Sequence, residues 1–276
     1  GDPLRAAELW LLAAAPGRLS GDFARIIDLT ARARQVFIDH GDSQRAARAL
    51  TEHARSMSSS GRLSDARPLL LQALEEVGPD ASRERLDTLV VLSSNLLING
   101  VRGAEGYANE ALHLAHTLAA DDATYSHVLS NRGLLHDTAG DRRLAAMFLH
   151  EGARLAELSG ESATLIMALG NLTNVLNVDR PAEAIEPNER AQALAAQIGD
   201  RTTGGLLLTN LAYSYLAVGD WDAAERTLAR GDHADLFTDH TYLAVTAALF
   251  SALRGDAETA RALTTVTALS RHCHIG

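Results

Sequence analysis

Three asparagines recur at nearly constant spacing in the middle of the chain. Asn131 and Asn171 are 40 residues apart, and Asn210 follows after another 39. A side-chain amide offers a hydrogen-bond donor and an acceptor, so a row of amides can bind the backbone of a peptide. The same row can instead join neighbouring helices through internal hydrogen bonds. The spacing supports both interpretations, a binding face and a structural contact.

Further polar residues extend this predicted binding face. Asn174 lies one helical turn after Asn171, and Tyr213 lies one turn after Asn210, so each pair shares one side of a helix. Arg132 is a further candidate, because a guanidinium group can bind a carboxylate or a phosphate. The alternative for Arg132 is that its aliphatic stem only covers apolar surface.

Residues typical of enzymes and metal sites do not form a recognisable pattern. His113 and His116 are three residues apart, but no third ligand follows at a diagnostic spacing. All 25 basic residues are arginine, which excludes a Gly-x-x-x-x-Gly-Lys phosphate loop and a catalytic lysine. The sequence also lacks a Gly-x-Ser-x-Gly motif. We therefore expect no enzyme activity, no metal site and no cofactor.

The composition limits the fold and the partners. Hydrophobic residues make up 46% of the chain but aromatic residues only 4%, which favours helices packed through small side chains. The formal net charge of -10 predicts that the chain does not bind nucleic acid directly. The single cysteine, Cys273, fits a reducing cytoplasm. No apolar stretch is long enough to predict a membrane span.

The elements that position the asparagines are clearest between residues 208 and 231. Apolar residues at i, i+3, i+4 and i+7 from Leu208 form one stripe of a helix. Gly219 and Asp220 interrupt this period, and a second apolar stripe begins at Trp221. The stretch predicts two antiparallel helices joined by a tight turn.

The same helix pair recurs along the whole chain. Gly61, Gly140 and Gly219 are separated by 79 residues each, twice a period of about 40, and four further columns of leucine or small residues align at this interval. We expect equivalent turns at the three glycines and one all-α domain over residues 1–276. Its seven helix pairs are predicted at about 3–41, 42–80, 82–121, 122–160, 161–199, 200–234 and 235–270.

Local signals predict where helices end. Gly-Asp or Gly-Glu follows several second helices, as at Gly41, Gly160 and Gly199, and predicts a left-handed glycine followed by an acidic helix start. The turn at residues 99–103 is expected to be looser than the others. Pro187 is expected to kink the second helix of the fifth pair or to delay its start.

The stretch from Leu208 to Leu228 resembles the tetratricopeptide repeat, or TPR. It has a large residue, then Leu-Ala, an aromatic residue, Gly-Asp followed by an aromatic residue, and finally alanine and a large residue. The resemblance implies a right-handed superhelical solenoid of about seven antiparallel helix pairs. It also implies that the first helices line a concave groove, where Asn131, Asn171 and Asn210 would lie.

The 40-residue period with its repeated Asn-Leu-Ala and Gly-Asp is similar to the C-terminal TPR regions of large bacterial regulators, the LuxR-type and signal-transduction ATPase regulators. This resemblance implies a non-catalytic sensor domain that binds a peptide, a small effector or a partner domain. The partner domain can be the ATPase or DNA-binding module of the same polypeptide. The alternative is a freestanding TPR adaptor that binds peptides or proteins.

Overall fold

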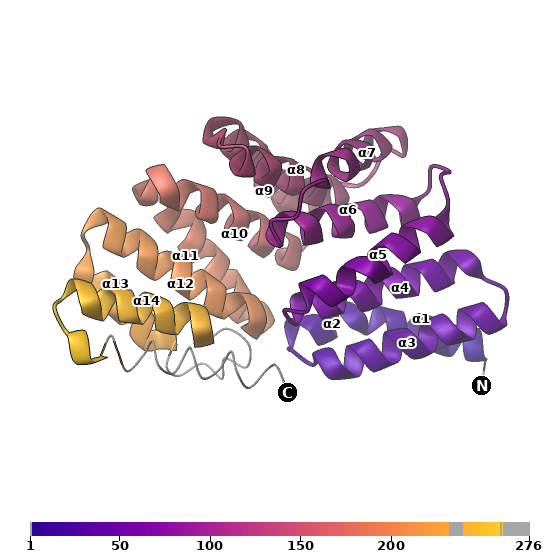
Figure 1. Cartoon of the computed structure of the whole chain (residues 1–276), viewed down its shortest axis with the longest axis horizontal. Coiled ribbons are helices and arrows are strands. Elements are labelled where there is room, and N and C mark those ends of the chain that lie inside the picture. The colour runs from indigo at the N-terminus through magenta and orange to yellow at the C-terminus, as the bar shows by residue number, and fades with distance from the viewer. Residues whose placement is uncertain (1, 232–239, 260, 262–276) are drawn as a thin grey trace. The chain divides into compact units, whose positions relative to one another are not determined.

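The computed structural model describes residues 2–231, 240–259 and 261, and this part of the chain is all α-helical (Figure 1). The chain divides into two compact units, residues 1–164 and residues 165–276, which are described separately here. Most of the second helix predicted for the seventh pair, and Cys273, lie outside the described residues. Within the described part, no helix is both long and apolar enough to cross a membrane.

The first unit consists of helices that pack with their neighbours in sequence. They are α1 (Pro3–Leu12), α2 (Ala14–Leu19), α3 (Phe23–Asp39), α4 (Ser43–Ser59), α5 (Leu63–Val77), α6 (Arg83–Ile98), α7 (Ala104–Thr117), α8 (Asp122–Thr138) and α9 (Arg142–Ser159). Each of these first helices contacts its own second helix, as α4, α6 and α8 do, and α4 and α6 also contact the next first helix.

The second unit continues the same pattern. Its helices are α10 (Ser162–Asp179), which starts at the end of the first unit, α11 (Pro181–Ile198), α12 (Arg201–Val218), α13 (Trp221–Gly231) and α14 (His240–Leu253). Here α12 packs against α11, α13 and α14.

The turns at Gly61, Gly140 and Gly219 have the same conformation, as their spacing predicts. Their φ angles are 84°, 83° and 85°, values that only glycine adopts at little cost. In each turn the glycine N–H donates to the carbonyl three residues earlier, and the next N–H donates to the carbonyl five residues earlier at 2.9 Å. This bonding satisfies the last carbonyl groups of the helix.

The predicted glycine stops are also confirmed. Gly41, Gly160 and Gly199 all have a φ of 72°, and Asp42 and Asp200 each accept the N–H of the residue three positions later. At the stop after α7, by contrast, a non-glycine residue, Ala119, adopts a positive φ of 46°.

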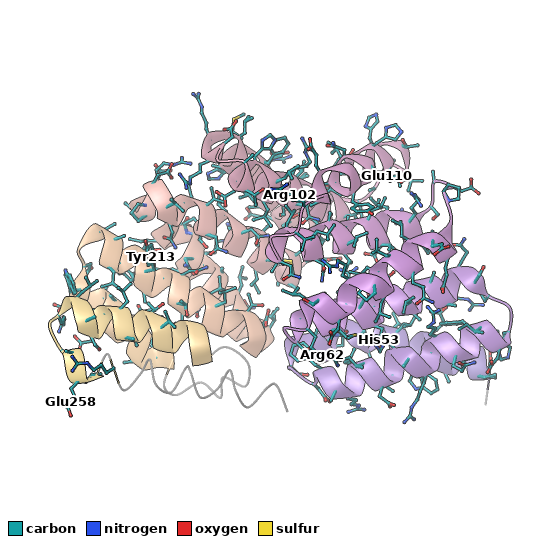
Figure 2. All side chains as sticks on the ribbon, viewed as in Figure 1. His53, Arg62, Arg102, Glu110, Tyr213 and Glu258 are labelled. Atoms are coloured by element: carbon teal, nitrogen blue, oxygen red, sulfur yellow. The ribbon has the colours of Figure 1, made fainter. Side chains whose placement is uncertain are left out.

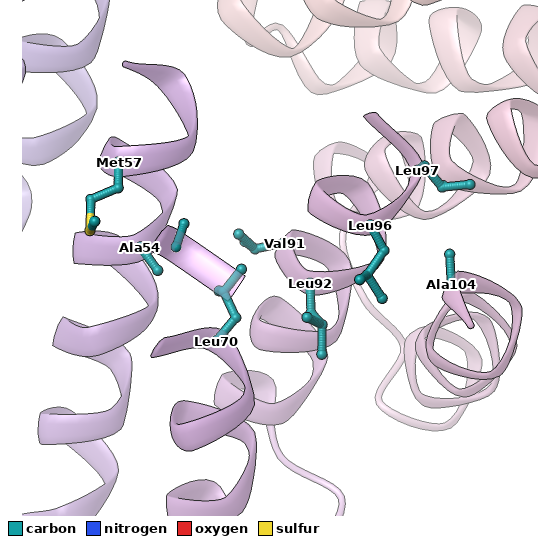
Figure 3. Close-up of a cluster of buried hydrophobic side chains, with 9 residues drawn as sticks. Ala54, Met57, Leu70, Val91, Leu92, Leu96, Leu97 and Ala104 are labelled. Carbon is teal, nitrogen blue, oxygen red and sulfur yellow. The ribbon is translucent and has the colours of Figure 1, made fainter. Parts of the chain in front are cut away.

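Small residues allow the paired helices to approach closely. A Cβ atom on Gly133 of α8 would lie 2.6 Å from the Leu149 Cγ of α9, a distance that real side chains do not tolerate. Ala54 and Ala212, at the same position in their repeats, are fully buried. The apolar core lies between successive pairs, as Figure 3 shows for a cluster contributed by α4, α5, α6 and the start of α7.

The expectation of an irregularity at Pro187 is wrong as regards the start of the helix. Helix α11 begins at Pro181 and runs unbroken through Pro187 to Ile198. Proline removes only its own N–H, which would have bonded the carbonyl of Glu183, and the turns on either side maintain the helix. Pro68 lies inside α5 in the same way.

The turn between α6 and α7, which the sequence predicts to be looser, is longer than the other described turns between paired helices. Gly100 has a φ of 62° and Gly103 a φ of 100°, and α7 begins only at Ala104. At the equivalent turn after α4, by contrast, the helix begins two residues after the glycine, at Leu63. The third repeat therefore carries two additional residues at this end.

Candidate functional site

Helices α10 and α12 present matching stripes of side chains in the second unit. On α10 the stripe contains Asn171 and Asn174, and on α12 it contains Asn210 and Tyr213. The two helices are directly joined there, because the Asn210 Nδ2 donates to the Asn174 Oδ1 at 2.7 Å. We call these four residues the amide face.

The amide face is uncharged and is flanked by exposed apolar side chains. Tyr213 is 45% exposed (Figure 2), and Met167 and Val178, one turn to either side of the asparagines on α10, are 52% and 55% exposed. No charged residue occurs between residues 162 and 178 of α10 or between residues 202 and 218 of α12. Exposed apolar residues around a few oriented polar groups are typical of binding sites.

Residues beneath the amide face fix its geometry. The buried Asn177 of α10 donates from Nδ2 to the backbone oxygen of Asn210 at 3.2 Å, and the Ser214 Oγ donates to the Asn177 Oδ1 at 2.5 Å. The Tyr215 hydroxyl donates to Glu189 of α11, and burial together with this bond raises the pKa of Tyr215 to about 12. The face thus rests on helices held in a fixed register.

The structure places Asn131 differently from Asn171 and Asn210. It belongs to the first unit, is only 6% exposed, and its Nδ2 donates to the Val90 oxygen and the Ser93 Oγ of α6, both at 2.9 Å. Both donors of this amide are therefore used to join α8 to α6. Asn131 thus makes the internal contact between helices that was the alternative to a binding face. We therefore leave this residue out of the amide face.

Arg132 is also engaged within the first unit. Its Nη1 donates to the Asn109 Oδ1 of α7, and its guanidinium carbon lies 5.8 Å from the centre of the Phe148 ring of α9. These contacts join α8 to the helices on both sides of it in sequence. The side chain therefore stabilises the packing of the repeat.

A row of alternating charges, which the sequence pattern did not predict, lies on α2, α4 and α6, and we call it the ionic row. It consists of Arg18, Glu52, Arg55 and Asp87. The Arg18 Nη1 lies 2.5 Å from the Glu52 Oε2, the Glu52 Oε1 lies 3.1 Å from the Arg55 Nε, and Arg55 bonds Asp87. The only sequence signal is the i, i+3 pair of Glu52 and Arg55.

The charges of the ionic row determine the protonation of its members. Burial opposes the charge of Glu52, but the neighbouring Arg55 and Arg18 hold the pKa of Glu52 below its ordinary value. Burial and then the charge of Arg55 lower the pKa of His127, on the adjacent α8, to about 4. Glu52 is therefore ionised at neutral pH, while His127 is neutral there.

No side-chain cluster suited to a metal ion occurs in the described part of the chain, where no three His, Cys, Asp or Glu side chains converge. His113 and His116 of α7 accordingly have no third ligand among the described residues. The structure shows no alternative chemistry at these positions.

Comparison with known proteins identifies the fold. The sequence matches no family model and no curated protein. Among solved structures, a Rap protein complexed with competence and sporulation factor is similar, with a TM-score of 0.73 and 17% identity over 99% of this chain and 76% of that one. The Rap conjugation gene regulator of plasmid pLS20, in complex with the Phr* peptide, has a TM-score of 0.70 and 16% identity, covering 95% and 73%.

A third similar structure is a signal-transduction ATPase with a TPR sensor from Pyrococcus horikoshii. Its TM-score is 0.63 and its identity 13%, over 90% of this chain but only 39% of that protein. At these identities the comparisons establish architecture rather than activity. The chain has the fold of a tetratricopeptide-repeat protein, as its repeat pattern predicts.

Proposed function

We propose that this chain is a non-catalytic protein-interaction domain whose amide face binds an extended peptide segment. The observation that carries the proposal is the pairing of Asn174 and Asn210 on a surface that holds no charge. Their mutual bond uses one donor and one acceptor, so each amide retains hydrogen-bonding capacity for a ligand. The backbone of an extended peptide needs both donors and acceptors at regular spacing.

The surroundings of the amide face indicate the kind of segment that it binds. Met167 and Val178 on α10 offer apolar contacts at either end of the asparagines, and Tyr213 offers an amphipathic one. A charged side chain would lose solvation here without gaining an opposite charge. We therefore expect a segment with apolar side chains and no charge at its centre.

We further propose that the domain is the sensor arm of a bacterial transcriptional regulator. Two similar structures support this reading, a conjugation gene regulator bound to a peptide and an ATPase with a TPR sensor. In such an arrangement the bound peptide would bias a neighbouring ATPase or DNA-binding module. Sequencing the reading frame on either side of this segment tests the arrangement, and a gene that encodes neither module would contradict it.

The binding role is tested by selection from a library of random peptides displayed on phage, followed by calorimetry with the enriched peptides. We expect a triple variant with Asn171→Ala, Asn174→Ala and Asn210→Ala to bind at least about tenfold more weakly, because each lost hydrogen bond contributes about 1 kcal/mol. The variant should melt near the native temperature, since these side chains are not part of the core.

The matched control is Asn131→Ala, which removes a buried amide of the first unit. This control should lower the melting temperature and leave peptide affinity per folded molecule unchanged. A triple variant that binds as tightly as the native chain would overturn the proposal. So would a triple variant that loses its fold while its remaining folded fraction binds normally.

A further inference from the structure

The first unit contains a pocket of about 470 Å³ that the amide face does not involve. It lies at the longer turn between α6 and α7, and its walls include Arg67 and Leu71 of α5, Leu96 of α6, Arg102 of the turn, and Gly106 and Tyr107 of α7. Figure 2 labels Arg102 at this turn and Glu110 further along α7. Pockets of this volume suit small molecules rather than folded partners.

One part of the pocket is apolar. Leu71 is 43% exposed, whereas the preceding residue on the same helix, Leu70, is buried in the core. Leu96 belongs to the core cluster of Figure 3 and forms part of the wall, and the partly buried Tyr107 packs beside it. A ligand with an apolar body would cover Leu71 and remove this surface from water.

The other part of the pocket is cationic. In the described part of the chain neither Arg67 nor Arg102 forms an ion pair or a hydrogen bond through its side chain, although the chain as a whole carries a net charge of -10. The one carboxylate of the wall, Glu110, is already neutralised, because its Oε1 lies 2.5 Å from the Arg85 Nη2. Two guanidinium groups without a carboxylate partner therefore favour an anionic ligand.

Neither the backbone conformation of Gly106 nor a close neighbour requires glycine at this position. A Cβ atom on Gly106 would meet no atom within 4 Å, although glycine in a helix costs up to about 1 kcal/mol relative to alanine. The two additional residues of this turn bring Arg102 to the same wall, and no other described turn between paired helices has them. Glycine is typical of places where a ligand approaches the backbone closely.

From these observations we infer that the pocket binds a small amphipathic carboxylate. The carboxylate group lies between Arg67 and Arg102, and the apolar body lies on Leu71, Leu96 and Tyr107. Gly106 leaves the space that the body occupies. This site differs from the proposed peptide site, because it selects an anion and includes no residue of the amide face.

The test uses naphthalene-2-carboxylate as the probe and the neutral naphthalene-2-carboxamide as its isosteric control, titrated into the whole chain by calorimetry. For a ligand of this size we expect a Kd on the order of 1 mM for the acid. The amide should bind at least about tenfold more weakly, because it forms no charge-assisted bonds. The variant Arg67→Gln/Arg102→Gln should remove this preference.

Two further variants locate the site. Gly106→Leu should abolish binding of the acid by filling the pocket while leaving the melting temperature unchanged or raised, because a Cβ atom at this position meets no atom within 4 Å and leucine favours a helix more than glycine does. The variant Asn174→Ala/Asn210→Ala should bind the acid normally. The pocket can therefore be confirmed even if the amide face proves not to bind peptides. The inference is overturned if the native chain shows no saturable binding, if acid and amide bind equally, or if Gly106→Leu still binds the acid.

Discussion

The two units use the first helices of their repeats in opposite ways. In the first unit these helices carry the ionic row, where each charge of Glu52 and Arg55 has an opposite charge beside it. In the second unit they carry the amide face, whose polar groups are neutral and retain bonding capacity. Polar groups that satisfy one another stabilise a register between helices, whereas groups left partly unsatisfied at an exposed surface are available to a ligand.

The same asparagine position has different hydrogen-bond partners in the two units. Asn131 reaches the backbone and a serine hydroxyl of the preceding first helix, so its amide is consumed by packing. Asn210 instead meets another exposed amide, that of Asn174. The neighbour across the helix interface thus decides whether the amide is used up by packing.

The ionic row provides the strongest test of this contrast. Glu52→Ala leaves the guanidinium groups of Arg18 and Arg55 without the carboxylate between them, in a position where the Glu52 side chain is 17% exposed. We expect the free energy of unfolding to fall by about 3 kcal/mol. Urea denaturation measures the loss, with Asn174→Ala in the second unit as a control that should change it by less than about 0.5 kcal/mol.

A loss below about 1 kcal/mol for Glu52→Ala would mean that the ionic row contributes no more than exposed ion pairs do. The two units would then not differ in the way described. Glu52→Gln, which keeps the shape of the side chain, separates the effect of charge from the effect of volume.

Acid should destabilise the first unit through His127. Its pKa is about 4 in the folded chain, mainly because of burial, and about 6.5 in the unfolded chain, so the unfolded state binds the proton first as the pH falls. The stabilisation of the folded state by neutral His127 is fully present above about pH 6.5, and it is lost as the pH falls to about 4. Between about pH 7.5 and pH 5 we expect the free energy of unfolding to fall by about 2 kcal/mol.

The variant His127→Gln should remove most of this pH dependence. A smaller slope should remain, because burial also lowers the pKa of His53 in the same unit. Denaturation curves with the same pH dependence in the native chain and in His127→Gln would contradict the assignment.

Stability measurements on single asparagines sharpen the comparison further. Asn131→Ala leaves the Ser93 hydroxyl and the Val90 carbonyl without their amide partner in a buried interface, and should cost about 1.5 kcal/mol. Asn171→Ala, on the partly exposed amide face, should change stability by less than about 0.5 kcal/mol. Equal losses at the two positions would show that both asparagines are structural.

The smallest expected effect concerns a helix stop of the first unit. Ala119 has a φ of 46°, whereas Gly199 of the second unit has a φ of 72° at a comparable stop. Ala119→Gly should relieve backbone strain and raise the free energy of unfolding by about 0.5 kcal/mol. Ala139→Gly, at a residue with a φ of -82°, is the matched control and should lower it.

Thermal melts of Ala119→Gly and Ala139→Gly show whether the backbone at Ala119 is strained or whether glycine only adds flexibility to the unfolded chain. If Ala119→Gly lowers the melting temperature as Ala139→Gly does, then the surrounding structure holds Ala119 without strain. The stop after α7 would then be equivalent to the glycine stops of the second unit.

The amino-acid sequence alone determined the repeat, its turns and its small contact positions. Gly61, Gly140 and Gly219 could be predicted as equivalent turns because a positive φ and the spacing of apolar residues are local properties of the chain. The small residue at Gly133 belongs to a column that repeats in the sequence, and small residues let two helices approach closely there.

Only the tertiary structure decided which polar residues are free to bind. The register between one first helix and the next puts Asn131 against α6 but leaves Asn174 exposed and Asn210 only half-buried, and it assembles Arg18, Glu52 and Asp87 from three helices. The periodicity of a single helix cannot reveal this, because side chains about 35 residues apart meet only when the helices pack. The same holds for the pocket at Arg102, which depends on how the longer turn folds against α5.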